Sequence, residues 1–396
     1  MYHYHFAILR KPVTAGEKIH SMKTETDMKT NTTNGRGLVL LMTLLLSLGT
    51  HPATGGIFGG VSQKDLTGVW IKTANYQDTI EIFEDGNGRW RDGTFVEWKL
   101  LDDGRLKIVS GGENKKILIG ATKDLAQKEL YIEASEYIPY DPSLAAVYTA
   151  LAMALHRQPV INESIDYASE RYRGLRQLDR NRQGGVGGAL VAMFEPAARD
   201  MAMVEIKKAK SRAQTAVADC NRGVDQAIQF APSFARAYIV KAQCFDYQNK
   251  LLELSSRLTE DFSQEQGERF AELRTSYLRE GIAARVKAIS IGLTTHWKAE
   301  MFNALARTHA TIADPDFQNG PLAVAYAQQA ISLQPDQISY LDTLAAAHAR
   351  MDDFKEAIAV QKKAIALLPA SQEADRTGYA ACLALYEQGQ AYTAAK

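Results

Sequence analysis

The sequence has few of the residues that mark a disulfide framework, a metal site or a nucleic-acid surface. Only three of its 396 residues are cysteines, its 46 basic side chains equal its 46 acidic ones, and its eight histidines form no cluster with metal-ligand spacing. Cys220, Cys244 and Cys382 fall in helical patterns, and we interpret them as small apolar residues that fill helix contacts. Cys220 and Cys244 would approach each other if their helices were neighbours.

The sequence also lacks the short motifs of common catalytic and nucleotide-binding sites. It contains no Gly-x-Ser-x-Gly elbow, and its acidic pairs, Asp102-Asp103 and Asp352-Asp353, are adjacent in predicted turns. The glycine cluster at 183–188 lacks the lysine and hydroxyl residue of a phosphate-binding loop, so we interpret it as a hinge. We therefore predict a protein that is not an enzyme and has no cofactor or metal.

An uncharged apolar run from Gly37 to Gly49 is followed by small residues, among them Ala53 and Gly55. The run is too short to cross a bilayer of ~30 Å comfortably, and this order of segments is typical of a secretory signal peptide. We therefore predict a leader in residues 1–55, with the signal peptide at about 28–55.

Export to the periplasm or secretion follows from this leader, with an uncleaved segment anchored in the inner membrane as the alternative. The leader is long, which favours translation from Met22 or Met28. Its removal takes away six basic and three acidic residues, so the mature chain has a small acidic excess. That balance gives no reason to expect a nucleic-acid partner.

Residues 63–137 change to the two-residue alternation of β-strands. Short β-branched and aromatic runs are separated by Asp-Gly and Gly-Gly turns, and glycine accepts the positive φ angle of a tight hairpin. We expect an antiparallel meander of six to eight strands that closes into a small barrel. The runs lie at 67–74, 78–85, 94–101, 105–112, 115–122 and 128–135.

Gly68 and Trp70 on the first predicted strand, followed by a meander, resemble the opening of lipocalin-type barrels, where the tryptophan plugs one end. That resemblance implies an interior able to hold a small apolar ligand. Because the strands are short, side chains alone can also fill the barrel, and we favour this packed core. It would consist of Trp70, Ile80, Ile82, Trp98, Leu106 and Ile108.

Residues 142–215 are predicted to form a helical connecting region that contains the glycine hinge. Two amphipathic segments, Leu144–Arg157 and Ile161–Arg180, are separated by a proline and predict two helices. A further helical segment covers 197–210, and its mixed charges are those of a solvated face.

From Ile338 to Pro369, small and large apolar residues recur at three- and four-residue steps. This spacing predicts two short helices joined by a tight turn, with small residues where the helix backbones approach closely. The pattern resembles the tetratricopeptide repeat, with His348 in the place of the family's tyrosine. The matching positions, in order, are Leu341, Leu344, Ala345, Ala357, Ala364 and Pro369.

A single repeat cannot bury its own apolar face, and similar units precede this one. The nearer unit carries Phe302, Leu305, Ala306 and His309, then Ala323, Ala327, Ala330, Ile331 and Pro335. A weaker unit carries Ala227, Pro232, Tyr238 and Ala242, with a partner helix near Gly281–Leu293. We therefore predict an α+β multidomain protein: a β barrel, then a tetratricopeptide-like array at 216–396 closed by a capping helix after Pro369.

In tetratricopeptide arrays the first helices of successive repeats line a concave groove that binds peptides. The resemblance therefore implies an exported scaffold that binds a protein or peptide partner, and mixed charges in the groove suit a polar peptide. The alternative is a carrier that binds a small apolar ligand in the barrel. The groove candidates are Arg236, Gln243, Tyr247, Glu300, Asn303, Arg307, Ser339, Asp342 and Arg350.

Overall fold

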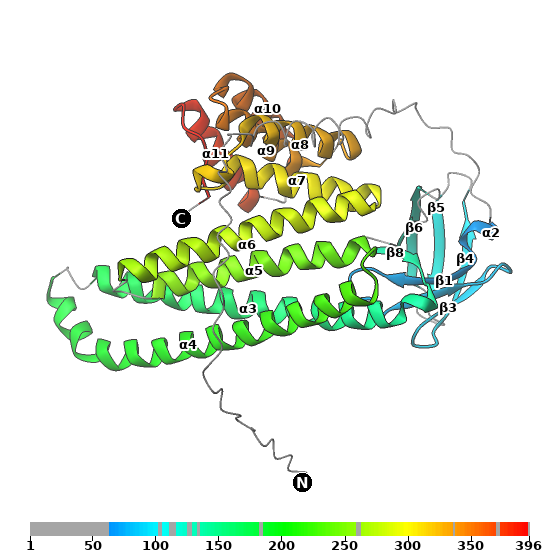
Figure 1. Ribbon diagram of the computed structural model, residues 1–396, viewed down its shortest axis with the longest axis horizontal. Coiled ribbons are helices and arrows are strands. Elements are labelled where there is room, and N and C mark those ends of the chain that lie inside the picture. Colours follow the sequence, from blue (N-terminus) through cyan, green and yellow to red (C-terminus); the bar gives the residue numbers. More distant parts are fainter. Residues whose placement is uncertain are drawn as a thin grey trace, which may run out of the picture. The chain divides into compact units, whose positions relative to one another are not determined.

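The protein is an antiparallel β barrel followed by an array of helices, as the sequence predicts (Figure 1). The computed structural model describes residues 63–101, 105–110, 116–124, 129–132, 135–181, 185–258, 263–335, 337–369 and 373–394. The predicted leader, residues 1–55, lies outside this part of the chain. Among the described helices, none combines the length and the apolar character that crossing a membrane requires.

Eight strands form the barrel, and each pairs antiparallel with its neighbours in the chain. They are β1 (Gly68–Lys72), β2 (Thr79–Ile82), β3 (Asn87–Trp90), β4 (Phe95–Leu100), β5 (Arg105–Ser110), β6 (Lys116–Asp124), β7 (Glu129–Ile132) and β8 (Ser135–Pro139). Pairing of β1 with β8, with Ile71 opposite Ile138, closes the barrel. The six predicted runs miss β3 and β8, because Asn, Gly and Pro are rare inside strands.

Two of the predicted Asp-Gly turns have the expected geometry. Gly86 and Gly93 both have a φ angle of +87°, a conformation that residues with a Cβ atom rarely adopt. In each turn the preceding aspartate accepts a backbone hydrogen bond two residues on, from Asn87 to Asp85 and from Thr94 to Asp92, both at 2.9 Å. Local turn chemistry thus sets the register between β2 and β3 and between β3 and β4.

The barrel interior is filled by its own side chains. The short helix α2 (Gln63–Leu66) lies against it, where the Leu66 carbonyl accepts a 2.9 Å hydrogen bond from Trp70 Nε1. All six predicted core residues belong to this cluster, and each is at most 5% exposed. The cluster consists of Leu66, Trp70, Ile80, Ile82, Val96, Trp98, Leu106, Ile108, Leu130, Ile132 and Tyr137.

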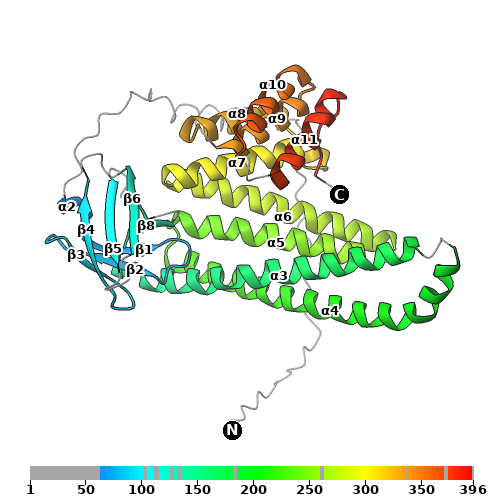
Figure 2. The same ribbon diagram turned by 180° about the vertical axis from the view of Figure 1, so that it is seen from behind.

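After the one-turn helix η2 (Pro142–Leu144), two long helices, α3 (Ala145–Asn181) and α4 (Gly185–Phe230), run side by side (Figures 1 and 2). The prediction of two separate helices in the first segment is wrong, because α3 continues through Pro159. Pro159 itself is exposed, while Ala154 and Ile161 on either side of it are fully buried in the core shared with α4 and α5. This burial on both sides outweighs the backbone hydrogen bond that proline cannot make.

Helix α4 extends across the predicted boundary between residues 215 and 216, so the connecting region and the repeat array share one helix. Its first turn contains Gly185–Gly188 of the predicted hinge, and residues 183 and 184 lie outside the described part. Farther along, a Cβ atom on Gly223 would lie 2.8 Å from the Ala150 carbonyl oxygen of α3. Glycine is therefore required for the close crossing of α3 and α4.

The remaining helices form successive antiparallel pairs, α5 with α6, α7 with α8 and α9 with α10, and α11 packs on the last pair (Figure 2). The predicted helix near Gly281–Leu293 is the end of the longer α6. The bounds are α5 (Ala235–Leu258), α6 (Gln264–Ile291), α7 (Thr295–Thr311), α8 (Gly320–Leu333), α9 (Ile338–Arg350), α10 (Phe354–Leu367) and α11 (Glu373–Glu387), with the one-turn helix η3 (Pro315–Phe317) after α7.

Small residues occupy the helix crossings at the positions that the repeat pattern predicts. Their side chains are fully buried, which brings the paired helix backbones close together. These residues are Ala306, Ala323, Ala327 and Ala330 in the α7–α8 pair and Ala345, Ala357 and Ala364 in the α9–α10 pair. The helical array with a closing helix is therefore confirmed as a fold.

Candidate functional site

A buried carboxylate lies where the barrel meets the helices. Strand β8 places Tyr137 in the barrel core, and the preceding Glu136 therefore lies on the other face of the sheet. Glu136 is only 6% exposed because the helices cover this outer face. The same junction buries Ile71 and Tyr76 of the barrel in the core formed by α3, α4 and α5.

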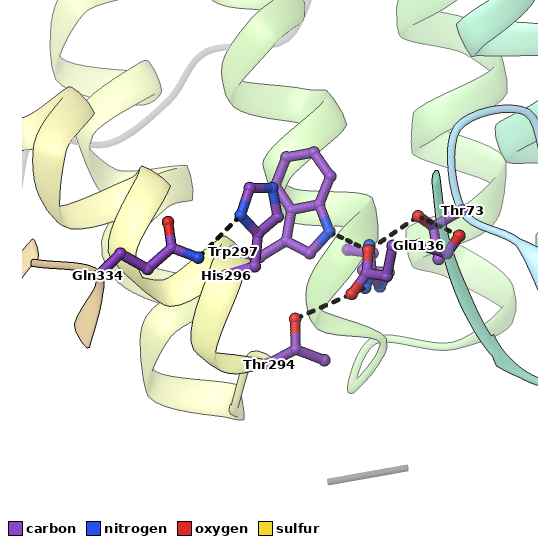
Figure 3. Close-up of polar contacts among 7 residues, drawn as sticks. Thr73, Glu136, Thr294, His296, Trp297 and Gln334 are labelled. Carbon is purple, nitrogen blue, oxygen red and sulfur yellow. Dashed lines mark hydrogen bonds and ion pairs between the residues drawn. The ribbon is translucent and has the colours of Figure 1, made fainter. Parts of the chain in front are cut away.

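Both oxygens of the Glu136 carboxylate are fully engaged, each by two donors (Figure 3). Oε1 accepts from the Arg236 guanidinium at 2.5 Å and from the Thr294 hydroxyl at 3.1 Å. Oε2 accepts from Trp297 Nε1 at 2.5 Å and from the Thr73 hydroxyl at 2.9 Å. The four donors come from the barrel, α5 and the start of α7, so one side chain joins three parts of the fold.

Electrostatics favours the charged form of this glutamate. Burial alone would raise the pKa of Glu136, but the charge of Arg236 and the hydrogen bonds from Arg236, Trp297 and Thr73 hold it below its usual value. Arg236 is equally buried, and its guanidinium lies 5.4 Å from the centre of the Trp297 ring. The two charges therefore neutralise each other inside the protein.

Helices α5 and α7 begin at this carboxylate, and the residue before α9 lines the same cavity as Glu136. Arg236 is the second residue of α5, Trp297 is the third of α7, and Gln337 immediately precedes α9. The Thr294 hydroxyl, at the N-cap of α7, donates to Glu136 and makes no capping bond to its own helix. Because helix N-termini carry a partial positive charge, the starts of α5 and α7 stabilise a carboxylate at this place.

A cavity of about 550 Å³ opens over the carboxylate. Its polar lining is dominated by amides: Gln158 of α3, Gln243 of α5, and Gln334 and Gln337 from the link between α8 and α9. The aromatic rings of Tyr131, His296 and Trp297 and the aliphatic side chains of Leu155, Ile239 and Val240 complete much of the wall. This lining offers neutral donors and acceptors beside apolar surfaces.

Three of the four cavity amides, those of Gln158, Gln243 and Gln334, bond to one another or to a neighbouring ring. Gln158 Nε2 donates to Gln243 Oε1 at 2.8 Å, which joins α3 to α5. Gln334 Nε2 lies 3.1 Å from His296 Nδ1, and the His296 ring stands edge-on to that of Trp297, with 5.3 Å between ring centres (Figure 3). These contacts fix the orientation of the three amides in the cavity wall.

Two of the nine predicted groove residues, Arg236 and Gln243, line this cavity. Tyr247, on the same helix α5, accepts a 3.3 Å hydrogen bond from the side-chain amide of Asn162 and lies outside the lining. The structure thus divides the α5 candidates: Arg236 has a structural role in the Glu136 pair, while Gln243 presents its amide to the cavity.

The candidates on α7 differ in their surroundings. Glu300 accepts a 2.7 Å hydrogen bond from the Tyr340 hydroxyl. Asn303 has a buried side-chain oxygen that finds no partner among the described residues, and Arg307 is exposed. This helix therefore presents both a polar atom without a partner and an accessible cation.

On α9, Ser339 is exposed and Asp342 accepts a 2.8 Å hydrogen bond from Gln361 Nε2. Burial raises the pKa of Asp342, although Gln361 and the nearby charge of Arg307 oppose the rise. Arg350 differs, because its Nε donates to the Ala310 carbonyl at 2.7 Å and its guanidinium also reaches the C-terminal segment at Thr393.

These environments predict that two charge reversals differ in their effect on the free energy of unfolding. We expect Arg307→Glu to change the free energy of unfolding by no more than about 1 kcal/mol, because the side chain is exposed and water screens its charge from Asp342. Arg350→Glu should cost about 1–3 kcal/mol, since it removes a charged donor from the partly buried Ala310 carbonyl. Urea unfolding of both variants measures the difference. Equal stability of the two would contradict the assigned role of Arg350.

Thr73, Glu136, Thr294 and Trp297 were not predicted from the sequence as site residues. An outward-facing glutamate on a strand is normally solvated, and the four donors are separated from it by between 63 and 161 residues in the chain. A weak sequence signal existed in the polar and aromatic residues at the starts of the first helices, which do not fit the repeat's packing positions.

Comparison with known proteins does not assign the chain. No protein-family model matches the sequence, and no curated protein matches it. The fold and the chemistry of the cavity must therefore support any functional inference.

Proposed function

We propose that this protein is an exported, non-enzymatic scaffold that binds a segment of a partner protein along α5, α7 and α9, as tetratricopeptide repeats do. The main support for this proposal is that these three helices begin at one cavity, which Gln243 and Arg236 help to line. A partner segment that follows the first helices would end in this cavity. The apolar run at 37–49 supports export.

The lining of the cavity favours a neutral, extended segment of polypeptide. Glu136 and Arg236 already pair with each other, so the cavity has little formal charge to offer a ligand. An extended peptide presents a donor and an acceptor at every residue, and an amide side chain such as Gln337 can satisfy either. The rings of Trp297 and His296 provide apolar surface for a side chain of that peptide.

Binding is favoured over catalysis because the single carboxylate of the cavity wall is poorly suited to proton transfer. A general base needs a free acceptor and a pKa near the working pH, whereas both oxygens of Glu136 are occupied and its pKa is lowered. Among the described residues, no group of three or more His, Cys, Asp or Glu side chains is arranged to hold a metal ion.

Site-specific photo-crosslinking in the native host tests the proposal. A photoreactive amino acid at Gln337, which lines the cavity, is expected to yield one discrete adduct whose peptide is identified by mass spectrometry. Lys363, exposed on α10, serves as the matched control and should yield no such adduct. A synthetic peptide of the identified sequence should compete for the Gln337 adduct, and Arg307→Glu should weaken capture while stability is kept.

The results can also count against the proposal. Equal adducts from Gln337 and Lys363, or a yield of Gln337 adduct that the synthetic peptide does not lower, would sink the cavity assignment. The carrier alternative is tested on the same protein, because gentle extraction followed by native mass spectrometry would then find a stoichiometric apolar small molecule. The filled barrel core gives no support to that alternative.

A further inference from the structure

The sulfur atoms of Cys220 and Cys244 meet inside the helical core. Cys220 lies on α4 and Cys244 on α5, the two helices joined by the short link at 231–234. Their Sγ atoms are 2.6 Å apart, and neither side chain has any exposed surface. Both cysteines are free thiols in the structure, and their separation is shorter than the ordinary contact of two unbonded thiols and longer than the covalent S–S distance of about 2.05 Å.

The surrounding contacts fix this register between α4 and α5. One turn away, the ammonium group of Lys241 on α5 lies 2.7 Å from the Asp225 carboxylate on α4. Val217 and Val224 of α4 and Val240 of α5 belong to the same buried core as the two cysteines. The cysteines are thus held opposite each other by packing that does not depend on them.

We propose that Cys220 and Cys244 form a disulfide bond in the mature protein, which covalently joins α4 to α5. Bond formation removes two protons and two electrons from the thiols, and a disulfide-bearing exchange partner such as oxidised glutathione accepts them and becomes two thiols. Exchange occurs while the chain folds, because both sulfurs are inaccessible afterwards. The proposal is independent of any partner protein.

Counting thiols tests this inference on the full chain. Reduced protein is refolded in a glutathione redox buffer, unfolded in guanidinium chloride with a thiol-alkylating reagent, and weighed intact. We expect one alkylation per chain, at Cys382, and three after prior reduction with dithiothreitol. The Cys382→Ser variant should show none and two under the same conditions, which removes pairing between chains as an explanation.

Peptide mapping locates the bond. Trypsin should release residues 213–222 linked to residues 242–250, and reduction should separate them. Cys244→Ser should leave Cys220 alkylated and lower the melting temperature by several degrees, and reduction should no longer change that temperature. Three alkylations in the unreduced wild-type chain, or a linked peptide that contains Cys382, would overturn the proposal.

Discussion

Replacing Glu136 with glutamine is expected to lower the free energy of unfolding by about 3–5 kcal/mol, because the buried Arg236 guanidinium then has no opposing charge. The amide keeps the shape of the side chain, so the loss reports on charge and hydrogen bonding. Urea denaturation followed by tryptophan fluorescence measures it, since Trp297 lies within the network. Among substitutions of polar residues, this one should lower the free energy of unfolding most.

Glu81→Gln is the matched control. Glu81, on β2, pairs with Arg89 at 2.6 Å, but its side chain is 30% exposed and that of Arg89 is 56% exposed. Exposed pairs contribute about 0–1 kcal/mol, because water solvates both charges when they separate. If both glutamates prove equally dispensable, Glu136 does not hold the barrel on the helices.

The pH dependence follows from the direction of the Glu136 shift. Its pKa is lower in the folded protein than the ordinary value of 4.5, so the unfolded chain binds the proton more readily. The stabilisation is therefore complete above the ordinary value and is lost as the pH falls through the lower, folded-state value. The stability difference between wild type and Glu136→Gln should accordingly narrow in acid.

Leu341→Ala is expected to cost about 2–5 kcal/mol, because it leaves a cavity at the packed face of α9. Leu341 is 4% exposed, whereas Leu344, three residues later on the same helix, is only half-buried. Leu344→Ala should therefore cost less, although the repeat pattern alone places both leucines in the core. Chemical denaturation of the two variants gives a comparison in which the chemistry of the change is identical.

A contrary ranking, with Leu344→Ala the more damaging, would mean that α9 presents a different face to α8 and α10. The measurement also bears on the array as a whole, since each helix pair is stabilised by its neighbours. A fall in cooperativity for Leu341→Ala, seen as a shallower denaturation curve, would show that the last pair unfolds separately.

Local chemistry accounts for the parts of the fold that could be predicted from the sequence. The Asp-Gly pair that contains Gly86 predicts a hairpin turn. Alanines such as Ala345 and Ala357 recur at the spacing of helix crossings, so the helix pairs could also be predicted from short stretches of sequence. The continuity of α3 was not visible, because a proline normally ends a helix. Helix α3 continues because the residues on both sides of Pro159 are buried against α4 and α5.

The junction could not be predicted because its residues come together only in the folded chain. Glu136 resembles any solvent-facing strand residue until Arg236, Thr294 and Trp297 arrive from 100 or more positions away. The groove prediction reached Arg236 and Gln243 through the repeat resemblance, but it had no way to distinguish a structural ion pair from a free binding residue. That distinction depends on burial and on the atoms at hydrogen-bond distance.

Closure of the barrel through β1 and β8 leaves the sheet without a free edge strand. In a closed barrel every strand already has a neighbour on both sides, so a peptide from another molecule cannot add to the sheet as an extra strand. Such strand addition underlies many peptide-binding domains and much unwanted self-association. Under the proposed function, a partner segment would therefore bind through side chains rather than at a barrel edge, and amides such as Gln243 and Gln337 would bond its backbone.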